Sequence, residues 1–268
     1  MPADQGSPLA RFDTRVAHPA RVYDYWLGGK DNFAADREAA QRVLAAQPGI
    51  RFGVRANRAF LRRVVRYLAA ELGVRQFLDI GTGIPTQENT HQVAQAAVPD
   101  ARIVYVDNDP IVLLHARALL SSSPGGATDY IDADLRDPAL ILERAAATLD
   151  YGEPVALMLL LILHLIPDEA DPYAIVATLL DAMPRGSYLV VSHPAKDIQA
   201  DAAAEAVRRY NELVSVPQTR RTHQEVCRFF DGLELLEPGV VQLHQWRPAG
   251  ELVPPKAVSS HGGVGRKA

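Results

Sequence analysis

Cysteine is nearly absent from this sequence of 268 residues. Cys227 is the only one, so the chain cannot form an internal disulfide, which favours a reducing compartment and a cytoplasmic protein. The first residues carry no apolar signal core. Long apolar runs are also missing, since the longest, Val155–Leu163, is far shorter than the roughly 20 residues that cross a bilayer. We therefore expect no membrane span.

The chain has no excess of positive charge, with 28 lysines and arginines against 32 acidic residues and a net charge of −4. This balance gives no general attraction to phosphate backbones, so we expect no nucleic-acid partner. The arginines between Arg51 and Arg66 fall at helical spacing, and a solvated helix face explains them better than a nucleic-acid patch. The eight histidines are scattered, without the spacing of metal ligands, so no metal is expected.

What the sequence does contain is an alternation of short β-rich runs and longer helical stretches. This pattern predicts an α/β fold with a Rossmann-like, doubly wound sheet, mostly parallel. The seven expected strands are Gln76–Ile80, Arg102–Asp107, Thr128–Ile131, Val155–Ile162, Ser187–Ser192, Leu233–Glu237 and Val240–Trp246. The expected helices between them are Gln87–Ala97, Pro110–Leu120, Pro138–Leu149, Pro172–Ala182 and Ala200–Ser215, with a capping box at Thr222–Glu225 opening another.

Three segments follow from this alternation. Residues 1–72 are mainly helical and precede the first strand, which predicts a helical lid, and residues 73–248 contain the whole sheet. Pro238-Gly239 leaves no room for a crossover helix between the last two strands, which should therefore form an antiparallel hairpin. Residues 249–268 are rich in proline and glycine, which predicts a flexible tail.

A glycine turn follows the first expected strand, at the edge of the sheet where open α/β proteins bind ligands. Gly81 and Gly83 would let the backbone turn tightly and approach a ligand, and Thr82 lies between them. Asp79 precedes the turn, where its carboxylate could accept from a ligand amine. The turn does not match the dinucleotide fingerprint, because Thr86 replaces the third glycine.

Acidic residues follow the next two strands as well. Asp107, after the second strand, could accept hydrogen bonds from both hydroxyls of a ribose, with Asn108 beside it, whereas Asp109 is better explained as a helix cap. Asp134, after the third strand, could accept from an adenine amine while Leu135 packs on the ring. Three acids in this order favour an adenosine-containing ligand over an arbitrary small molecule.

The ordered set resembles the class I S-adenosylmethionine-dependent methyltransferases, and in particular the actinobacterial domain-of-unknown-function 574, or methyltransferase-19, family. The matching segments are Ala20–Tyr25, Leu27–Phe33, Phe77–Thr86, Tyr105–Asp109, His164, Ile166–Glu169, Gly186–Tyr188, Ser192-His193, Phe230–Leu233 and Trp246–Pro248. They span nearly the whole chain, and the LGGKDNF segment at Leu27–Phe33 is far more specific than a glycine turn. The resemblance implies S-adenosylmethionine as cofactor, an antiparallel seventh strand and a helical segment that covers the cofactor.

The resemblance also directs attention to the lid. Aromatic faces attract a sulfonium cation, so one of Tyr23, Tyr25 and Trp26 could face the methyl group, with Tyr25 favoured over Trp26. Anchoring the lid to the core is the alternative for all three. Asn32 is a candidate for cofactor binding, with capping of the next helix as a close rival.

Methyl transfer from a sulfonium is an in-line displacement, which needs a base only if the acceptor must lose a proton. His164, after the fourth strand, is the first candidate for that base, against the alternative of a hydrogen-bonded core histidine. Ser192 and His193 could line the acceptor site or shape a turn before Pro194. The acidic balance and the lid favour a small-molecule acceptor.

Two other functions fit parts of the pattern. A nicotinamide-dependent oxidoreductase would also use Asp107 for its ribose, but the missing third glycine, the acid at Asp134 and the terminal hairpin count against it. A non-catalytic or regulatory protein that binds S-adenosylmethionine would keep the same cofactor residues. Both hypotheses are separated from a methyltransferase by cofactor preference and by turnover.

Overall fold

An eight-stranded sheet runs through the molecule in the order β3-β2-β1-β4-β5-β8-β6, with β7 paired to β8 outside this path. The computed structural model describes residues 13–85, 88–119, 123, 125–214, 216–248 and 258–268. The strands are β1 Gln76–Ile80, β2 Arg102–Asp107, β3 Ala127–Asp132, β4 Val155–Leu160, β5 Tyr188–Pro194, β6 Leu233–Leu235, β7 Val241–Gln242 and β8 Ser260–Lys267.

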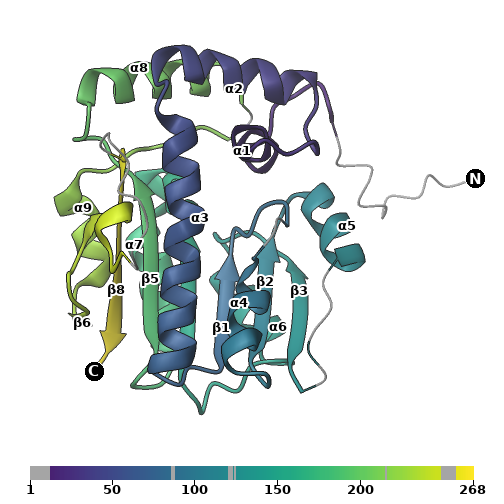
Figure 1. The fold of residues 1–268 in the computed structure, drawn as a ribbon, viewed down its shortest axis with the longest axis vertical. Coiled ribbons are helices and arrows are strands. Elements are labelled where there is room, and N and C mark those ends of the chain that lie inside the picture. The colour runs from purple at the N-terminus through teal and green to yellow at the C-terminus, as the bar shows by residue number, and fades with distance from the viewer. Residues whose placement is uncertain (1–12, 86–87, 120–122, 124, 215, 249–257) are drawn as a thin grey trace, which may run out of the picture.

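Helices lie on both sides of the sheet and above one end of it (Figure 1). The α-helices are α1 Pro19–Leu27, α2 Ala34–Ala46, α3 Ile50–Arg66, α4 Thr90–Ala97, α5 Pro110–Leu119, α6 Pro138–Ala145, α7 Pro172–Asp181, α8 Ala200–Asn211 and α9 His223–Cys227. The shorter turns are a π-helical η2 Tyr67–Glu71 and the 3₁₀ segments η3 Leu163–Leu165, η4 Asp168–Ala170, η5 Arg228–Phe230 and η6 Leu243–Gln245.

The first five strands pair in parallel, and β6, β7 and β8 add antiparallel pairs. This arrangement confirms the doubly wound, mostly parallel sheet expected from the sequence, with one strand more than expected. The expected helix starts are also present, because Asp137 and Asp171 cap their helices and Thr222 forms the capping box with Glu225.

The prediction of a flexible tail is wrong for its last part, although residues 249–257 lie outside the described residues. Ser260–Lys267 forms β8, which inserts between β5 and β6, and the expected hairpin is replaced by separate pairing of β6 and β7 with β8. The glycines that suggested flexibility are needed for packing. A Cβ on Gly262 would overlap the Leu243 side chain, and one on Gly265 would lie 2.9 Å from the Phe230 ring.

The assignment of residues 1–72 to a lid needs correction at α3. The buried side of this helix, including Phe60 and Val64, belongs to the same apolar cluster as Phe77 and Ile103 of the sheet. An amphipathic helix buries its apolar face where it finds an apolar partner, and for most of α3 this partner is the sheet. Of residues 1–72, only α1, α2 and the start of α3 belong to the layer above the sheet.

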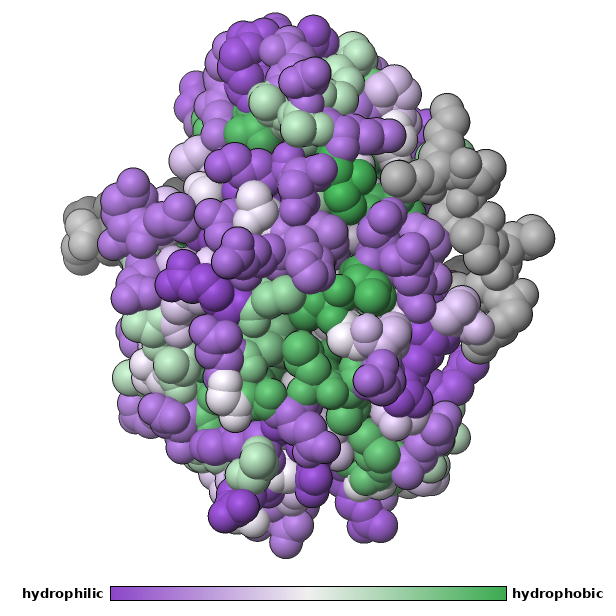
Figure 2. Space-filling model, turned by 90° about the vertical axis from the view of Figure 1, so that its left-hand side faces the viewer, coloured by the Kyte–Doolittle hydropathy of each residue, from purple (hydrophilic) through white to green (hydrophobic). Residues whose placement is uncertain are grey.

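The upper layer is completed by α8, which lies beside α2 although their first residues, Ala34 and Ala200, are far apart in the sequence. Figure 1 shows both helices at the top with α1 beneath them. A separate apolar cluster holds this helical layer together, with Val22 of α1, Val43 of α2, Val54 of α3 and Tyr210 of α8 among its members. Figure 2 shows mainly hydrophilic residues over the outside of this layer.

Candidate active site

A cavity lies between the helical layer and the carboxyl ends of β1, β2 and β4. Its lining joins residues from the glycine turn, from the ends of the strands, from the underside of α1, from the first turns of α3 and from the loop before α9. Parallel strands bring their carboxyl ends to one edge, so residues far apart in the sequence meet there. Of the cofactor residues expected from the sequence, those lining the cavity are Asp79, Gly81, Thr82, Gly83, Asp107, Asn108, Asp134 and Leu135.

The glycine turn has the conformation expected for a close backbone approach. Gly81 and Gly83 have φ angles of 75° and 65°, in the left-handed region that favours glycine. A Cβ on Gly81 would lie 2.6 Å from the Ile162 side chain, so a larger residue would push the end of β4 away. The Thr82 hydroxyl lies 3.2 Å from that of Tyr130 on β3, which ties the turn to the third strand.

Asp79 and Asp107 are buried carboxylates that line the cavity at this edge. Asp79 accepts a hydrogen bond of 2.6 Å from the Thr90 hydroxyl, and burial raises its pKa to about 6. Asp107 accepts from the backbone N–H of Gly83 at 2.8 Å and of Asp109 at 3.0 Å, and burial raises its pKa as well. Asp107 therefore fixes the glycine turn while it lines the cavity.

Asp134 is more exposed and is held by cationic and amide groups. Arg136 donates three hydrogen bonds to its carboxylate, and Asn108 donates one of 3.1 Å. The Arg136 contact keeps the Asp134 pKa below its ordinary value, so the carboxylate is ionised at neutral pH. The adjacent Leu135 is buried, with 4% of its surface exposed, and supplies an apolar wall.

Tyr25 and Asn32 do not line the cavity, contrary to the expectation from the sequence. The Tyr25 hydroxyl accepts from Gln41 at 3.3 Å, and Asn32 donates to the Asp24 carboxylate at 2.8 Å. On α1, side chains at positions 23 and 26 share the face that turns to the cavity, whereas position 25 points elsewhere. Tyr23 and Trp26 are therefore the aromatic residues of α1 that line it.

The LGGKDNF segment forms a tight turn around the Asp24 carboxylate. Asp24 accepts from the backbone N–H of Asp31 at 3.0 Å and from Asn32, and Gly28 has a φ of 91° at the end of α1. A Cβ on Gly29 would overlap the Asp24 carboxylate. The close approach of the backbone to the Asp24 carboxylate holds α1 in place. It explains why the sequence of this segment is so distinctive.

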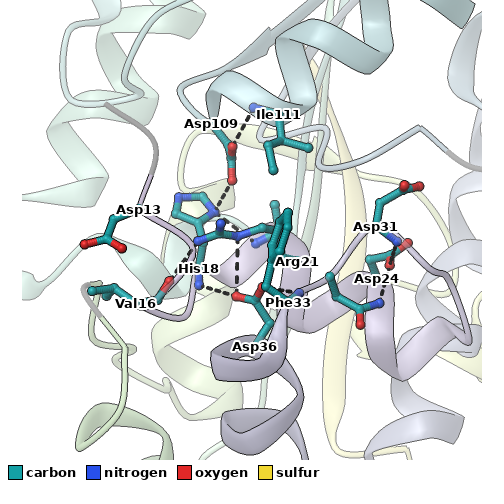
Figure 3. A network of polar contacts seen from close by, with 12 residues as sticks. Asp13, Val16, His18, Arg21, Asp24, Asp31, Phe33, Asp36, Asp109 and Ile111 are labelled. Carbon is teal, nitrogen blue, oxygen red and sulfur yellow. Dashed lines mark hydrogen bonds and ion pairs between the residues drawn. The ribbon is translucent and has the colours of Figure 1, made fainter. Parts of the chain in front are cut away.

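His18 is a residue that no pattern in the sequence pointed to. Its ring lies 2.6 Å from the Asp109 carboxylate at the start of α5, and its backbone N–H donates to Asp36 of α2 at 2.9 Å (Figure 3). Although burial raises the Asp109 pKa, the His18 contact holds it below its ordinary value. His18 thus joins the helical layer to the residues next to Asp107.

His164 lies at the opposite end of the cavity, in η3. Burial, followed by the nearby His193 and two arginines, lowers its pKa well below the ordinary value, so the ring is neutral at pH 7. Its Nδ1 atom is buried without a hydrogen-bond partner in the described part of the chain. Ser192 and His193 are fully buried outside the lining, where they bond to Asn57 and Arg221.

Comparison with known proteins identifies the family to which this chain belongs. Residues 5–268 match a family model described as S-adenosyl methyltransferase. The chain belongs to this family. The chain is therefore an S-adenosylmethionine-dependent methyltransferase, as the resemblance implied, and neither the oxidoreductase nor the purely binding alternative is favoured.

Two solved structures resemble the methyltransferase over nearly its whole length. A DUF574 family protein from Streptomyces avermitilis is 45% identical, covers 96% of this chain and 100% of its own, and has a TM-score of 0.93. A candidate methyltransferase from Thermobifida fusca is 40% identical, with 99% of each chain covered and a TM-score of 0.87. No protein of curated function matches the sequence.

More distant structures share the fold alone. The plantazolicin methyltransferase BpumL, solved with a triazolic desmethylPZN analog and SAH, is 11% identical over 93% of this chain and 96% of its own, with a TM-score of 0.54.

Among the residues that the structure describes, no group of histidine, cysteine or acidic side chains is placed to hold a metal ion. Within the same residues, no helix is both long and apolar enough to cross a membrane.

Proposed function

We propose that this methyltransferase transfers the methyl group to a small molecule enclosed between the sheet and the helical layer. The observation that carries the proposal is the cavity itself, whose lining continues from the acids of β1, β2 and β3 to His164 and the loop before α9. An acceptor at the His164 end would lie under α8 and away from bulk water, which suits a molecule of modest size.

The cofactor residues follow from the positions of the charged groups. Asp107 would accept the ribose hydroxyls, and Asp134 with Leu135 would hold the adenine. Asp79 would attract the ammonium group of the methionine part, which brings the sulfonium toward β4. Tyr23 and Trp26 replace Tyr25 as the aromatic candidates that face the sulfonium, because both line the cavity.

His164 is the proposed general base. A neutral imidazole can accept the proton of a hydroxyl or amine acceptor as the methyl group arrives, although a lowered pKa makes it a weak base. Alignment and exclusion of water would then contribute most of the rate, since the methyl donor is already activated by the positive charge on sulfur.

Titration calorimetry with S-adenosylmethionine, S-adenosylhomocysteine and NAD tests the assignment of the cofactor residues. Asp107→Asn keeps the shape of the side chain but removes a charged acceptor, so we expect affinity for both adenosyl ligands to fall about tenfold or more. His164→Ala is the matched control at the other end of the cavity and should leave affinity within about twofold while turnover falls. Equal binding of NAD, or an indifferent Asp107→Asn, would overturn the proposal.

A further inference from the structure

A buried arginine without a carboxylate partner lines the cavity at its acceptor end. Arg220 lies in the loop between α8 and α9, and 8% of its surface is exposed. Its guanidinium donates to two neutral amides, at 3.1 Å to the Gln47 side chain and at 3.5 Å to that of Gln218. No acidic group within the described residues forms an ion pair with it.

The next residue, Arg221, is a buried arginine with a structural role and serves as a comparison. Arg221 is 2% exposed, and its guanidinium contacts the Asp168 carboxylate at 2.6 Å and the carbonyl oxygens of Leu163 and Ile166 at 2.9 and 3.0 Å. Those bonds fix the turn after β4. Arg221 does not line the cavity, whereas Arg220 does.

Leaving a cation buried beside amides alone is costly. Burial lowers the Arg220 pKa to about 10, which still leaves the guanidinium charged at neutral pH. An anion that enters the cavity would offset this cost by accepting hydrogen bonds from the remaining N–H groups. The planar guanidinium can hold a carboxylate with two parallel hydrogen bonds.

The position of Arg220 assigns that anion to the acceptor. The backbone N–H of the preceding Thr219 donates to the His164 carbonyl at 2.7 Å, so Arg220 is held beside the proposed base. The carboxylate of the cofactor's methionine part has another cation available, Arg58, which lines the cavity. The Arg58 charge partly offsets the rise that burial causes in the Asp79 pKa. Apolar lining at the acceptor end comes from Leu165 and Val216.

We propose that the methyl acceptor is a carboxylate-bearing molecule with an apolar skeleton, whose carboxylate is anchored by Arg220 with Gln47 and Gln218 positioning the guanidinium. This inference rests on the proposed function, because it needs the cofactor at the other end of the cavity. It makes Arg220 a determinant of substrate class.

Benzoate and its neutral isostere benzamide are suitable probes, added to the full chain saturated with S-adenosylhomocysteine. Calorimetry should show benzoate binding better than benzamide to the wild type, and Arg220→Gln should weaken benzoate about tenfold or more without affecting benzamide. Arg220→Lys should retain part of the preference, since it keeps the charge but loses the planar fork. Equal binding of the two probes to the wild type would overturn the inference.

Thermal unfolding and a second ligand pair separate acceptor binding by Arg220 from a structural role and from cofactor binding. Arg220→Gln should leave the Tm of the ligand-free protein unchanged or higher. Arg221→Gln should lower the Tm because the buried carbonyl oxygens of Leu163 and Ile166 lose their donor. A fall in Tm for Arg220→Gln would indicate a structural role and contradict the inference.

If Arg220→Gln weakened binding of S-adenosylhomocysteine but not of 5′-methylthioadenosine, which lacks the carboxylate, Arg220 would be reassigned to the cofactor. Failure of the wild type to bind S-adenosylhomocysteine would instead refute the proposed function.

Discussion

Burial shifts the pKa of several side chains that line the cavity. It raises the pKa of Asp79 and Asp107 and lowers that of His164, whereas Asp134, bound to Arg136, keeps a lowered pKa. Two protonatable carboxylates thus lie at the end where a cationic cofactor is proposed to bind. A bound ammonium or sulfonium favours their charged forms, so cofactor binding and ionisation are coupled.

Asp79 gives this coupling a measurable pH dependence. Its pKa of about 6 leaves the carboxylate charged at pH 7 and mostly protonated at pH 5, where it no longer attracts an ammonium group. We expect affinity for S-adenosylhomocysteine to fall about tenfold from pH 7 to pH 5, because about nine in ten Asp79 side chains are then neutral. Affinity for 5′-methylthioadenosine, which has no ammonium group, should fall less.

Asp79→Asn is the control for this titration, which calorimetry at a series of pH values can follow. With no ionisable group at position 79, the two ligands should lose affinity in parallel. A difference between the ligands that persists in Asp79→Asn would show that another group senses the ammonium.

At the scale of helices and strands, the features that depend only on neighbouring residues could be predicted from the sequence. The positions of the parallel strands, the acid-capped helix starts and the glycine turn were all predicted from spacing and turn residues. The strand β8 was missed because its glycines resemble a flexible tail until Leu243 and Phe230 are seen to pack over them. The orientation of Tyr25 was missed because the inward face of α1 depends on where α2 and α3 lie.

The turn after α1 depends on the absence of a side chain at Gly29. Gly29→Ala would drive a methyl group into the Asp24 carboxylate, which would have to abandon its bonds to Asp31 and Asn32. We expect this substitution to lower the free energy of unfolding by about 1–3 kcal/mol. Chemical denaturation followed by circular dichroism would measure the change.

Gly53→Ala is the matched control, because Gly53 lies within α3 and a Cβ there meets nothing within 4 Å. Replacing a helical glycine by alanine should raise stability by up to about 1 kcal/mol. If Gly29→Ala were as well tolerated as Gly53→Ala, the account of the LGGKDNF segment would be wrong.

At the scale of the whole molecule, the cavity lies between the sheet and the helical layer. Residues from both halves of the sequence are needed to form it. The floor comes from strands between Gln76 and Leu160, and the cover comes from α1 and α2 together with α8, which follows all of the parallel strands. Arg220 meets Gln47 across 173 residues of sequence. A contact between residues so far apart in the sequence leaves no local pattern. Most residues that we propose for the cofactor could therefore be named from the sequence, whereas those proposed for the acceptor, apart from His164, could not.

A crystal structure of the full chain with S-adenosylhomocysteine tests the central claim most directly. We expect the ligand in the cavity beneath α1, with Asp107 bonded to the ribose hydroxyls, Asp134 near the adenine amine and the sulfur directed toward the His164 end. An adenosyl ligand bound elsewhere, or one in this cavity that touches neither Asp107 nor Asp134, would contradict the account.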